Sequence, residues 1–251
     1  MFAIQSVLKA EAMSNLRRKV SVLRLSVFLV AGAMLAACQT VAMKTTGTFE
    51  PPPPGSRVVL MTPDVVLSEL QAAGLEEPKA EWTAAAKEHI RTEIDHFLVE
   101  RHLSMVRYTE PSDPAELTVH NRLINLHGAV GNALVLHTLL PNMQLPTKKD
   151  KFDWSLGPNV AHLREDFDSD LALFIYIRDS YSSAGRAALV MAGLLLGAPV
   201  QGGHQRGFAS LVDLRTGDIV WFNRIQLGVG DLREPESAKK VVEGLLTDIP
   251  L

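Results

Sequence analysis

A short apolar stretch late in the chain decides the fold: Leu171-Ala172-Leu173-Phe174-Ile175-Tyr176-Ile177. It has the length of one strand, and its aliphatic and aromatic side chains would fall on both faces of that strand. A strand without a polar face is typical of a sheet that is covered on both sides. We therefore expect a sheet between two layers of helices, the arrangement of three-layer α/β domains.

Segments with the periods of strands and helices precede this stretch. The apolar run at 58–61 ends before Pro63, which predicts a buried strand. From Trp82, apolar residues recur at three- and four-residue spacing, as they do on a helix. Asp113 and Pro114 suit the cap and the first position of a second helix. The expected elements are strand 58–61, helix 82–101, strand 103–108 and helix 113–140, the last weakened at Gly128 and Gly131.

Four more elements follow the apolar stretch. The turn Arg215-Thr216-Gly217-Asp218 joins two apolar segments, 207–214 and 219–227, in a predicted hairpin. One helix is expected before the hairpin, at 187–196, and another after it, at 235–247. The complete order, β-α-β-α-β-α-β-β-α, predicts a three-layer α/β domain with a mixed sheet.

The helix expected at 187–196 differs from the others because it is apolar on every side, with Leu194, Leu195 and Leu196 at its end. It is too short to cross a bilayer, which takes about 20 apolar residues. Such a helix is either fully buried or presents an apolar patch to a partner. Of these two alternatives we expect burial.

The second strand of the hairpin predicts a structural role for Trp221. Strand alternation groups Ile219, Trp221, Asn223 and Ile225 on one face. Since most of these residues are apolar, that face should meet a helix. We expect Trp221 to lie in the core or at a junction between elements.

The amino-terminal part has the layout of a signal peptide. A basic segment around Arg17 precedes the apolar run Leu25–Leu35. The residues Leu35-Ala36-Ala37-Cys38 close this run and resemble the lipobox of bacterial lipoproteins, in which signal peptidase cuts before a lipid-bearing cysteine. We therefore expect residues 1–37 to be a cleaved signal peptide, with Leu35, Ala36 and Ala37 at the cleavage site and Cys38 lipidated. The alternative is an uncleaved anchor helix over residues 20–37.

The cysteine also bears on location and on domain organisation. Cys38 is the one cysteine among the 251 residues, so no disulfide can form within a chain. In enterobacterial lipoproteins an aspartate after the cysteine retains the protein in the inner membrane. Gln39 stands there instead, so the resemblance implies lipid anchoring at the periplasmic face of the outer membrane. Residues 38–55, which end near four prolines, are expected to form a lipidated tether, and residues 56–251 a single periplasmic domain.

Charge and motifs exclude several classes of function. From Cys38 onward the chain has 20 basic and 27 acidic residues, a net charge of −7, which argues against nucleic-acid binding. The chain contains no G-x-x-x-x-G-K-[ST], no G-x-S-x-G and no H-E-x-x-H. These are the motifs of phosphate-binding loops, hydrolase nucleophile elbows and zinc proteases. We expect no catalytic residue and no cofactor.

Two patterns resemble metal-ligand sets, but we interpret both otherwise. His89 and His96 on one helix, and His120 and His127 on the next, are each seven residues apart. That is about 10 Å along a helix, too far for two ligands of one ion, so we expect residues at the boundary of the apolar stripes. Asp166–Asp170 (DFDSD) lacks the glycine and the glutamate of a calcium loop and predicts a solvated turn. We expect no metal site.

Two late segments carry a resemblance to a known group of proteins. They are the strand Asp170–Ile175 and the hairpin Ala209–Trp221, in which a Thr-Gly turn joins an apolar strand to a strand with tryptophan. The domain resembles the fold family of the TolB amino-terminal domain and the curli-secretion lipoproteins. This resemblance implies a mostly non-enzymatic role in envelope assembly, with envelope proteins or further copies of the chain as partners. The chain lacks the paired long alternating segments of membrane-spanning hairpins, so we expect no secretion pore.

A polar segment follows Ile177, at the carboxyl end of a strand, where open α/β sheets bind ligands. We favour the alternative, a polar loop in which Ser182 or Ser183 caps the next helix. The sequence therefore predicts a lipid-anchored, non-enzymatic interaction or assembly protein of the cell envelope, which meets the membrane through the lipid on Cys38. The alternative is a periplasmic hydrolase or a small-ligand-binding lipoprotein that uses the loops after Ile177 and around His204. The candidate ligand residues are Arg178, Asp179, Ser182, Ser183 and His204.

Overall fold

The computed structural model describes residues 42–43, 56–139, 141–148, 151–225 and 230–251. The chain divides into two units, Met1–Gln39 and Thr40–Leu251, and every described residue belongs to the second. The expected signal peptide with Leu35, Ala36 and Ala37, the lipidation site Cys38 and most of the expected tether lie outside the described residues. They stay predictions.

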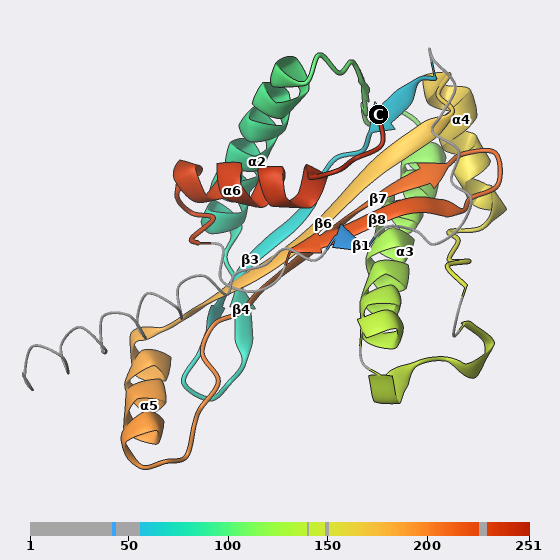
Figure 1. Ribbon diagram of the computed structural model, residues 1–251. Coiled ribbons are helices and arrows are strands. Elements are labelled where there is room, and N and C mark those ends of the chain that lie inside the picture. The colour runs from blue at the N-terminus through green and yellow to red at the C-terminus, as the bar shows by residue number, and fades with distance from the viewer. Residues whose placement is uncertain (1–41, 44–55, 140, 149–150, 226–229) are drawn as a thin grey trace, which may run out of the picture. The chain divides into compact units, whose positions relative to one another are not determined.

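Strand β6 (Leu171–Ser182) organises the sheet (Figure 1). On one edge it pairs antiparallel with β7 (Gln205–Asp213), which pairs antiparallel with β8 (Ile219–Ile225). Along its other edge lie β2 (Val58–Leu60) and then β3 (Asp64–Leu70), both parallel to it. Three short strands complete the sheet: β5 (Val106–Arg107) parallel to β2, β1 (Ala42–Met43) antiparallel to β8, and β4 (Glu76–Pro78) antiparallel to β3. The predicted mixed sheet is confirmed.

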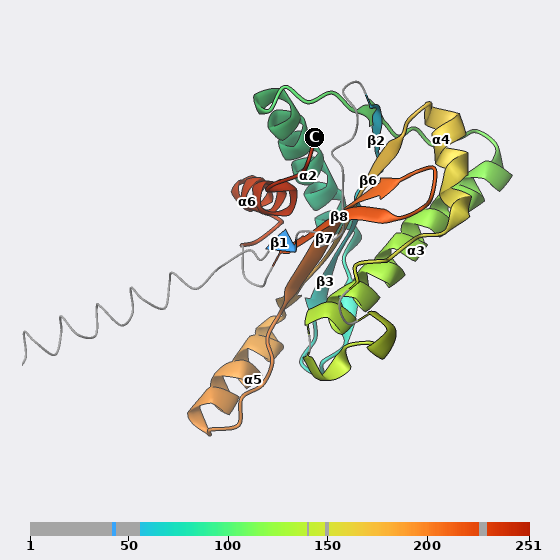
Figure 2. The same cartoon turned by 45° about the vertical axis from the view of Figure 1, so that its right-hand side comes forward.

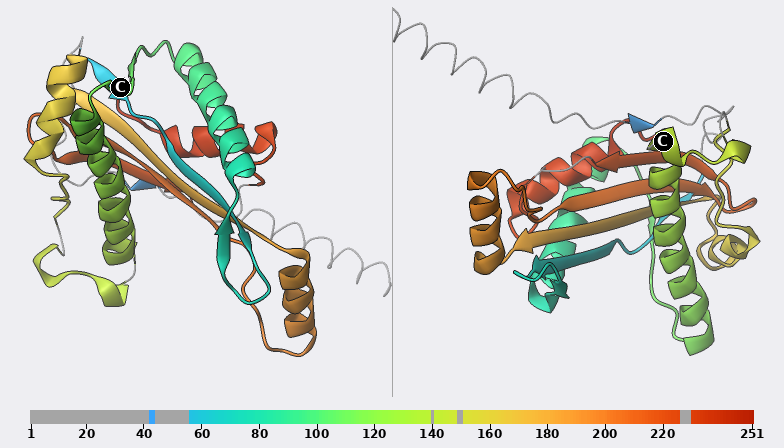
Figure 3. Two further views of the ribbon diagram at one scale, coloured as in Figure 1. Left: turned by 180° about the vertical axis from the view of Figure 1, so that it is seen from behind. Right: turned by 90° about the horizontal axis from the view of Figure 1, so that it is seen from below.

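Helices pack on both faces of the sheet (Figure 3). On one face, α2 (Ala80–Glu100) and α6 (Pro235–Leu246) share a core with the sheet that includes Ile90, Leu173 and Val241. On the other face, α3 (Pro114–Leu139) and α4 (Ala161–Phe167) pack around Leu163 and Phe174. Because β6 contributes side chains to both cores, the prediction of a three-layer α/β domain around this strand is confirmed. Short 3-10 turns η1 (Pro141–Met143), η2 (Pro146–Lys148) and η3 (Pro158–Val160) lie between α3 and α4.

Among the described elements that the sequence pattern did not indicate are β3, β4 and α4. In β3 the buried residues Val65, Leu67 and Leu70 follow an imperfect alternation, in which the half-buried Val66 is also apolar and the buried Ser68 is polar. Its extended backbone is instead held by pairing with β6 along its whole length, and ladder hydrogen bonds leave no period in the sequence. The expected strand at 103–108 is conversely reduced to the two residues of β5.

The prediction that Gly128 and Gly131 weaken the second helix is wrong, since α3 is continuous through both. A Cβ atom at Gly131 would lie 2.0 Å from the ring of Phe208, and one at Gly128 would lie 3.0 Å from the ring of Tyr176. The two glycines thus let the helix backbone approach aromatic rings on the sheet. Close packing offsets their low helix propensity, which is worth only about 1 kcal/mol per residue.

The predicted hairpin and the structural role of Trp221 are confirmed. Trp221 is buried in the core that also contains the inner side of α6. Two residues further along β8, the side-chain amide of Asn223 donates to the carbonyls of Gly244 (2.9 Å) and Leu245 (3.0 Å) in α6. Ile219 does not share this face. A β-bulge between β7 and β8 shifts the alternation, so Ile219 packs in the core on the other side of the sheet.

Candidate interaction surface

Helix α5 (Ala184–Leu195) connects β6 to β7 beyond the end of the sheet (Figure 2). The prediction that this helix is buried is wrong. Gly193 is its one buried residue, whereas the side chains at its end are exposed: 68% for Leu194 and 82% each for Leu195 and Leu196. We call the exposed residues Leu189, Met191, Leu194, Leu195 and Leu196 the apolar tip.

The amino-terminal end of α5 is capped by a side chain of the polar segment. The Ser183 hydroxyl accepts a hydrogen bond from the backbone N–H of Arg186 at 3.2 Å, which confirms the expected cap. Ser182 has a different role, because its hydroxyl accepts from the N–H of Gly203 at 3.0 Å on the returning chain. Both serines therefore fix the position from which α5 leaves the sheet.

The carboxyl-terminal end of α5 is closed by a Schellman motif. The N–H of Ala198 donates to the carbonyl of Gly193 at 2.8 Å, and the N–H of Gly197 donates to the carbonyl of Leu194 at 3.3 Å. Gly197 has the left-handed φ of 70° that this motif requires. Pro199 follows, so the chain turns back towards β7.

The inner contact of α5 is small. A Cβ atom at Gly193 would lie 2.4 Å from the carbonyl oxygen of Ala198 and 2.9 Å from Val200, so the returning chain lies directly on the helix backbone there. Arg186, in the first turn, donates to the carbonyls of Gln201 (2.8 Å) and Ala72 (3.3 Å). These contacts fix the helix at its base and at one glycine, and they leave the apolar tip exposed.

The polar segment expected after Ile177 is not a loop, because β6 continues to Ser182. Arg178 forms an ion pair with Asp64 on β3 (Nη2 to Oδ2, 2.8 Å) and lies over the ring of Tyr176 at 4.1 Å. Pairing with β3 and β7 extends the strand past the apolar stretch on which its predicted length was based. The side chains of successive residues in this segment therefore point to opposite faces of the sheet.

Asp179 lies in a buried polar cluster on the face of α2. Its carboxylate accepts hydrogen bonds from the Tyr181 hydroxyl and from the Gln205 side-chain amide (2.7 Å). Burial raises the pKa of Asp179, although both hydrogen bonds act to lower it. Burial also raises the pKa of Tyr181, whose hydroxyl accepts in turn from the backbone N–H of Leu232 at 2.7 Å. The cluster joins β6 and β7 to the segment before α6, and Arg233 lies over the Tyr181 ring at 4.1 Å.

His204 has partners of its own at the start of β7. Its Nδ1 lies 3.2 Å from the hydroxyl of Ser180, and its Nε2 lies 3.5 Å from a carboxylate oxygen of Glu76 on β4. Arg178, Asp179, Ser182, Ser183 and His204 are thus each held by a different partner. The structure brings them to one end of the sheet without making their polar atoms converge on one point.

We had expected His120 and His127 of α3 to lie at the boundary of an apolar stripe, but both are buried. His127 Nε2 lies 2.8 Å from the hydroxyl of Ser210, and its ring stacks on Phe174 at 5.0 Å. Burial lowers the pKa of His127 to about 3, so the ring is neutral at pH 7. His120 Nε2 lies 2.9 Å from Asp166 on α4. Their spacing of seven residues marks one helix face, but it does not say which polar atoms of other elements meet that face.

The other residues of the metal-like patterns have similarly local roles. His89 donates from Nδ1 to the carbonyl of Leu232 at 3.2 Å, while His96 lies near Glu93. In the DFDSD segment, Asp168 has the left-handed φ of 43° that ends α4 and pairs with Arg57. Within the part of the chain that the structure describes, no three histidine, cysteine or acidic residues are placed to hold a metal ion.

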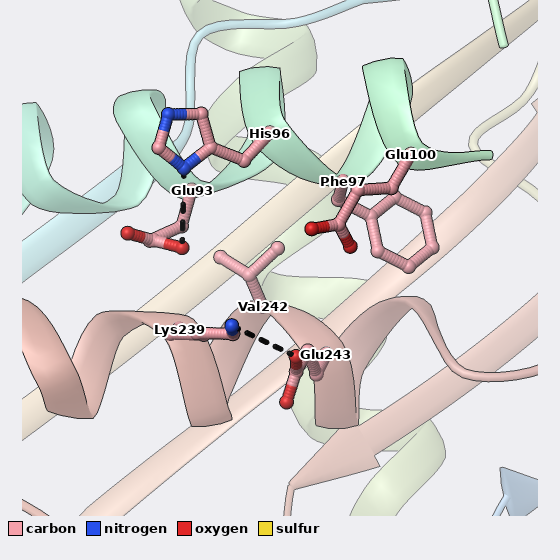
Figure 4. A pocket seen from close by; sticks show the side chains of 7 residues that line it. All are labelled: Glu93, His96, Phe97, Glu100, Lys239, Val242 and Glu243. Carbon is pink, nitrogen blue, oxygen red and sulfur yellow. Dashed lines mark ion pairs between the residues drawn. The ribbon is translucent and has the colours of Figure 1, made fainter. Parts of the chain in front are cut away.

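A shallow pocket lies between α2 and α6 (Figure 4). Its volume is about 30 Å³, room for about one water molecule, whereas pockets for small-molecule ligands have roughly 300–1,000 Å³. Two ion pairs, His96 with Glu93 and Lys239 with Glu243, line it at 3.9 Å each. The pocket is therefore too small for a substrate. Its lining is Glu93, His96, Phe97, Glu100, Lys239, Val242 and Glu243.

Comparisons with known proteins add little to these observations. No family model and no curated protein sequence matches the chain. Among solved structures, the PelC dodecamer from Paraburkholderia phytofirmans is similar, with 10% identity and a TM-score of 0.39, over 83% of this chain and 94% of that chain. The LpoB C-terminal domain from Salmonella enterica is similar with 12% identity and a TM-score of 0.25, over 69% and 82% of the two chains. Likenesses this distant assign neither a fold nor a function to this chain.

None of the described helices combines the length and the hydropathy that a membrane span requires.

Proposed function

We propose that the protein is a lipid-anchored, non-enzymatic interaction or assembly protein of the bacterial cell envelope, and that the apolar tip of α5 is its working surface. The single observation that carries this proposal is the exposure of the tip. Of the eleven exposed large apolar residues in the described chain, five belong to it. Monomeric proteins seldom expose contiguous apolar surface of this kind unless it binds something.

The capping of both ends of α5 supports the same proposal. Ser183 caps the beginning of α5, and the Schellman motif at Gly197 closes its end. A helix with both ends satisfied presents its side chains in a fixed arrangement, which lowers the entropy cost of binding. The tip is therefore suited to recognition.

The alternative, a hydrolase or ligand-binding protein, would need the polar residues after Ile177 and around His204 to share a cavity. Each of these side chains already has an internal partner that holds the sheet or the base of α5. Asp179, for example, is engaged by Tyr181 and Gln205. No observation in the described residues favours the alternative over a binding surface.

The location in the envelope rests on the sequence around Cys38. A fatty-acid probe supplied to growing cells should label the parent chain and should not label the Cys38→Ser variant, which should remain unprocessed. Gln39 then supports delivery to the outer membrane, with the domain on its periplasmic side. Label on the serine variant would contradict the lipoprotein assignment.

Photo-crosslinking in living cells tests the working surface. A benzoylphenylalanine residue at Leu195 should crosslink to a defined envelope component, whether protein or phospholipid. The matched control is Val99 at the end of α2, which is 75% exposed and also apolar but lies outside the tip. Equal crosslinking at both positions, or none at Leu195, would show that the tip is not the working surface.

A further inference from the structure

We infer that the apolar tip enters one leaflet of the phospholipid bilayer at which the chain is anchored. This inference rests on the proposed function and names the partner of the same surface. Three observations support it: the distribution of apolar residues around α5, the satisfied N–H groups at its end, and the charges along the segment.

The apolar surface of α5 extends around the helix. A helix that docks in a protein groove buries one stripe, at i, i+3, i+4 and i+7, and keeps a polar face towards water. In α5 and the residue after it, Leu189, Met191, Leu194, Leu195 and Leu196 project in several directions, and all are exposed. Hydrocarbon chains, which surround an inserted helix on all sides, match this distribution better than a groove does.

The end of α5 leaves few backbone N–H groups in need of water. The N–H groups of Leu196, Gly197 and Ala198 donate to the carbonyls of Ala192, Leu194 and Gly193. Pro199, the next residue, has no N–H to satisfy. A run of four residues without a free donor is what a lipid environment demands, because an unsatisfied N–H there costs several kcal/mol.

The charges along the segment are also compatible with a bilayer surface. From Ala184 to His204 the sequence contains no aspartate and no glutamate. Arg186 is its one arginine and lies in the first turn, at the base of the tip. A cation at this level can meet the phosphate groups of anionic lipids while the leucines lie deeper.

The length of α5 limits how far the tip can enter. Twelve residues make a helix of about 18 Å, whereas one leaflet contributes about half of the roughly 30 Å hydrocarbon core. The helix is therefore long enough to enter one leaflet and too short to cross both. It would act as a second attachment beside the lipid.

Spin labelling of the full mature lipoprotein in vesicles of phosphatidylethanolamine and phosphatidylglycerol tests the inference. Because the predicted lipid occupies the sulfur of Cys38, an introduced cysteine is the one free thiol. A nitroxide is attached at Leu195→Cys and, as the matched control, at Val99→Cys. Thermal unfolding of both labelled variants should equal that of the parent, which shows that they are folded. Collisions with oxygen, which partitions into hydrocarbon, are compared with collisions with a water-soluble nickel chelate.

The ratio of oxygen to nickel collisions should be several-fold higher at position 195 than at position 99. Equal ratios at the two positions would overturn the inference. A label at position 195 that is shielded from both reagents would also overturn it, because a protein partner or a second copy of the chain would then cover the tip. That second result would leave the proposed function intact. A tip that crosslinks to nothing in cells would contradict both the proposed function and this inference.

Discussion

Helices α5 and α6 have the same length, twelve residues each, and opposite relations to the core. In α6 the buried residues recur at helical spacing, and lysines and glutamates occupy the other side. In α5 nearly all side chains are apolar, yet Gly193 is the one buried residue. The comparison teaches that periodicity, more than apolar content, accompanies burial of a helix against a sheet. The buried positions of α6 are Ala238, Val241, Val242, Leu245 and Leu246.

Trp221→Ala should have the largest effect, because it removes the side chain on which α6 and the hairpin pack. The free energy of unfolding should fall by about 3–5 kcal/mol, measured by urea denaturation of the protein without its signal peptide. Val99→Ala, a truncation at an exposed site, serves as the control and should change it by less than about 0.5 kcal/mol. Unchanged stability in Trp221→Ala would mean that the core beneath α6 does not depend on this residue.

Leu245→Ala tests the buried side of the comparison directly. Leu245 is buried in the core shared by α2, α6 and the sheet, so the truncation should cost about 2–5 kcal/mol of unfolding free energy. The same denaturation experiment measures it. A cost below about 1 kcal/mol, small for a buried leucine, would place α6 nearer to α5 in its dependence on packing.

The buried layers should also make the stability depend on pH, whereas the apolar tip has no titratable side chain and should not contribute. Burial lowers the pKa of His127 from 6.5 to about 3, so between these values the unfolded chain binds the proton that the folded chain rejects. The contribution of His127 to the free energy of unfolding is therefore fully present above pH 6.5. It falls by about 1.4 kcal/mol per pH unit as the pH decreases towards 3. His127→Gln should remove this part of the slope in denaturation curves recorded from pH 7 to 4. His96→Gln, at an exposed histidine of α2, should keep this slope. An identical slope in both variants would refute the assignment of the slope to His127.

Leu195→Ala should have the smallest effect on stability. It is the same chemical change as in Leu245→Ala, but Leu195 is exposed, so the free energy of unfolding should change by less than about 0.5 kcal/mol. The measurement is the same denaturation curve, recorded side by side with Leu245→Ala. A loss of several kcal/mol would mean that the tip is packed in solution, for instance against a second copy, and the contrast between the two helices would disappear.

The sequence predicted those parts of the fold in which side-chain pattern and burial coincide. Leu171–Ile177 predicted a strand buried on both faces, and the hairpin around Gly217 was identified from its turn. The sequence pattern did not predict β3, which is held by its pairing with β6. Strand alternation also placed Ile219 on the wrong face, because a β-bulge changes the alternation and the spacing of apolar residues does not reveal it.

The candidate site was less predictable than the fold. The sequence identified a helix at 187–196 that is apolar on every side, and it named an apolar patch as one of two alternatives. Choosing between them requires knowing what lies next to the helix, and periodicity carries no such information. The residues singled out for a ligand, such as Asp179 and His204, look polar and available in the sequence. Their internal partners, Tyr181 and Ser180 among them, become evident only in the folded chain.

By itself, the sequence determined the α/β class, the strand at Leu171, the stripe of α6 and the role of Trp221, because each depends on the spacing of apolar residues along one segment. Only the tertiary structure decided that α5 lies beyond the sheet and that His127 is buried beside Ser210. The physical reason is that burial depends on neighbours distant in the chain. At α5 those neighbours contact only the base of the helix and Gly193, so its leucines stay exposed.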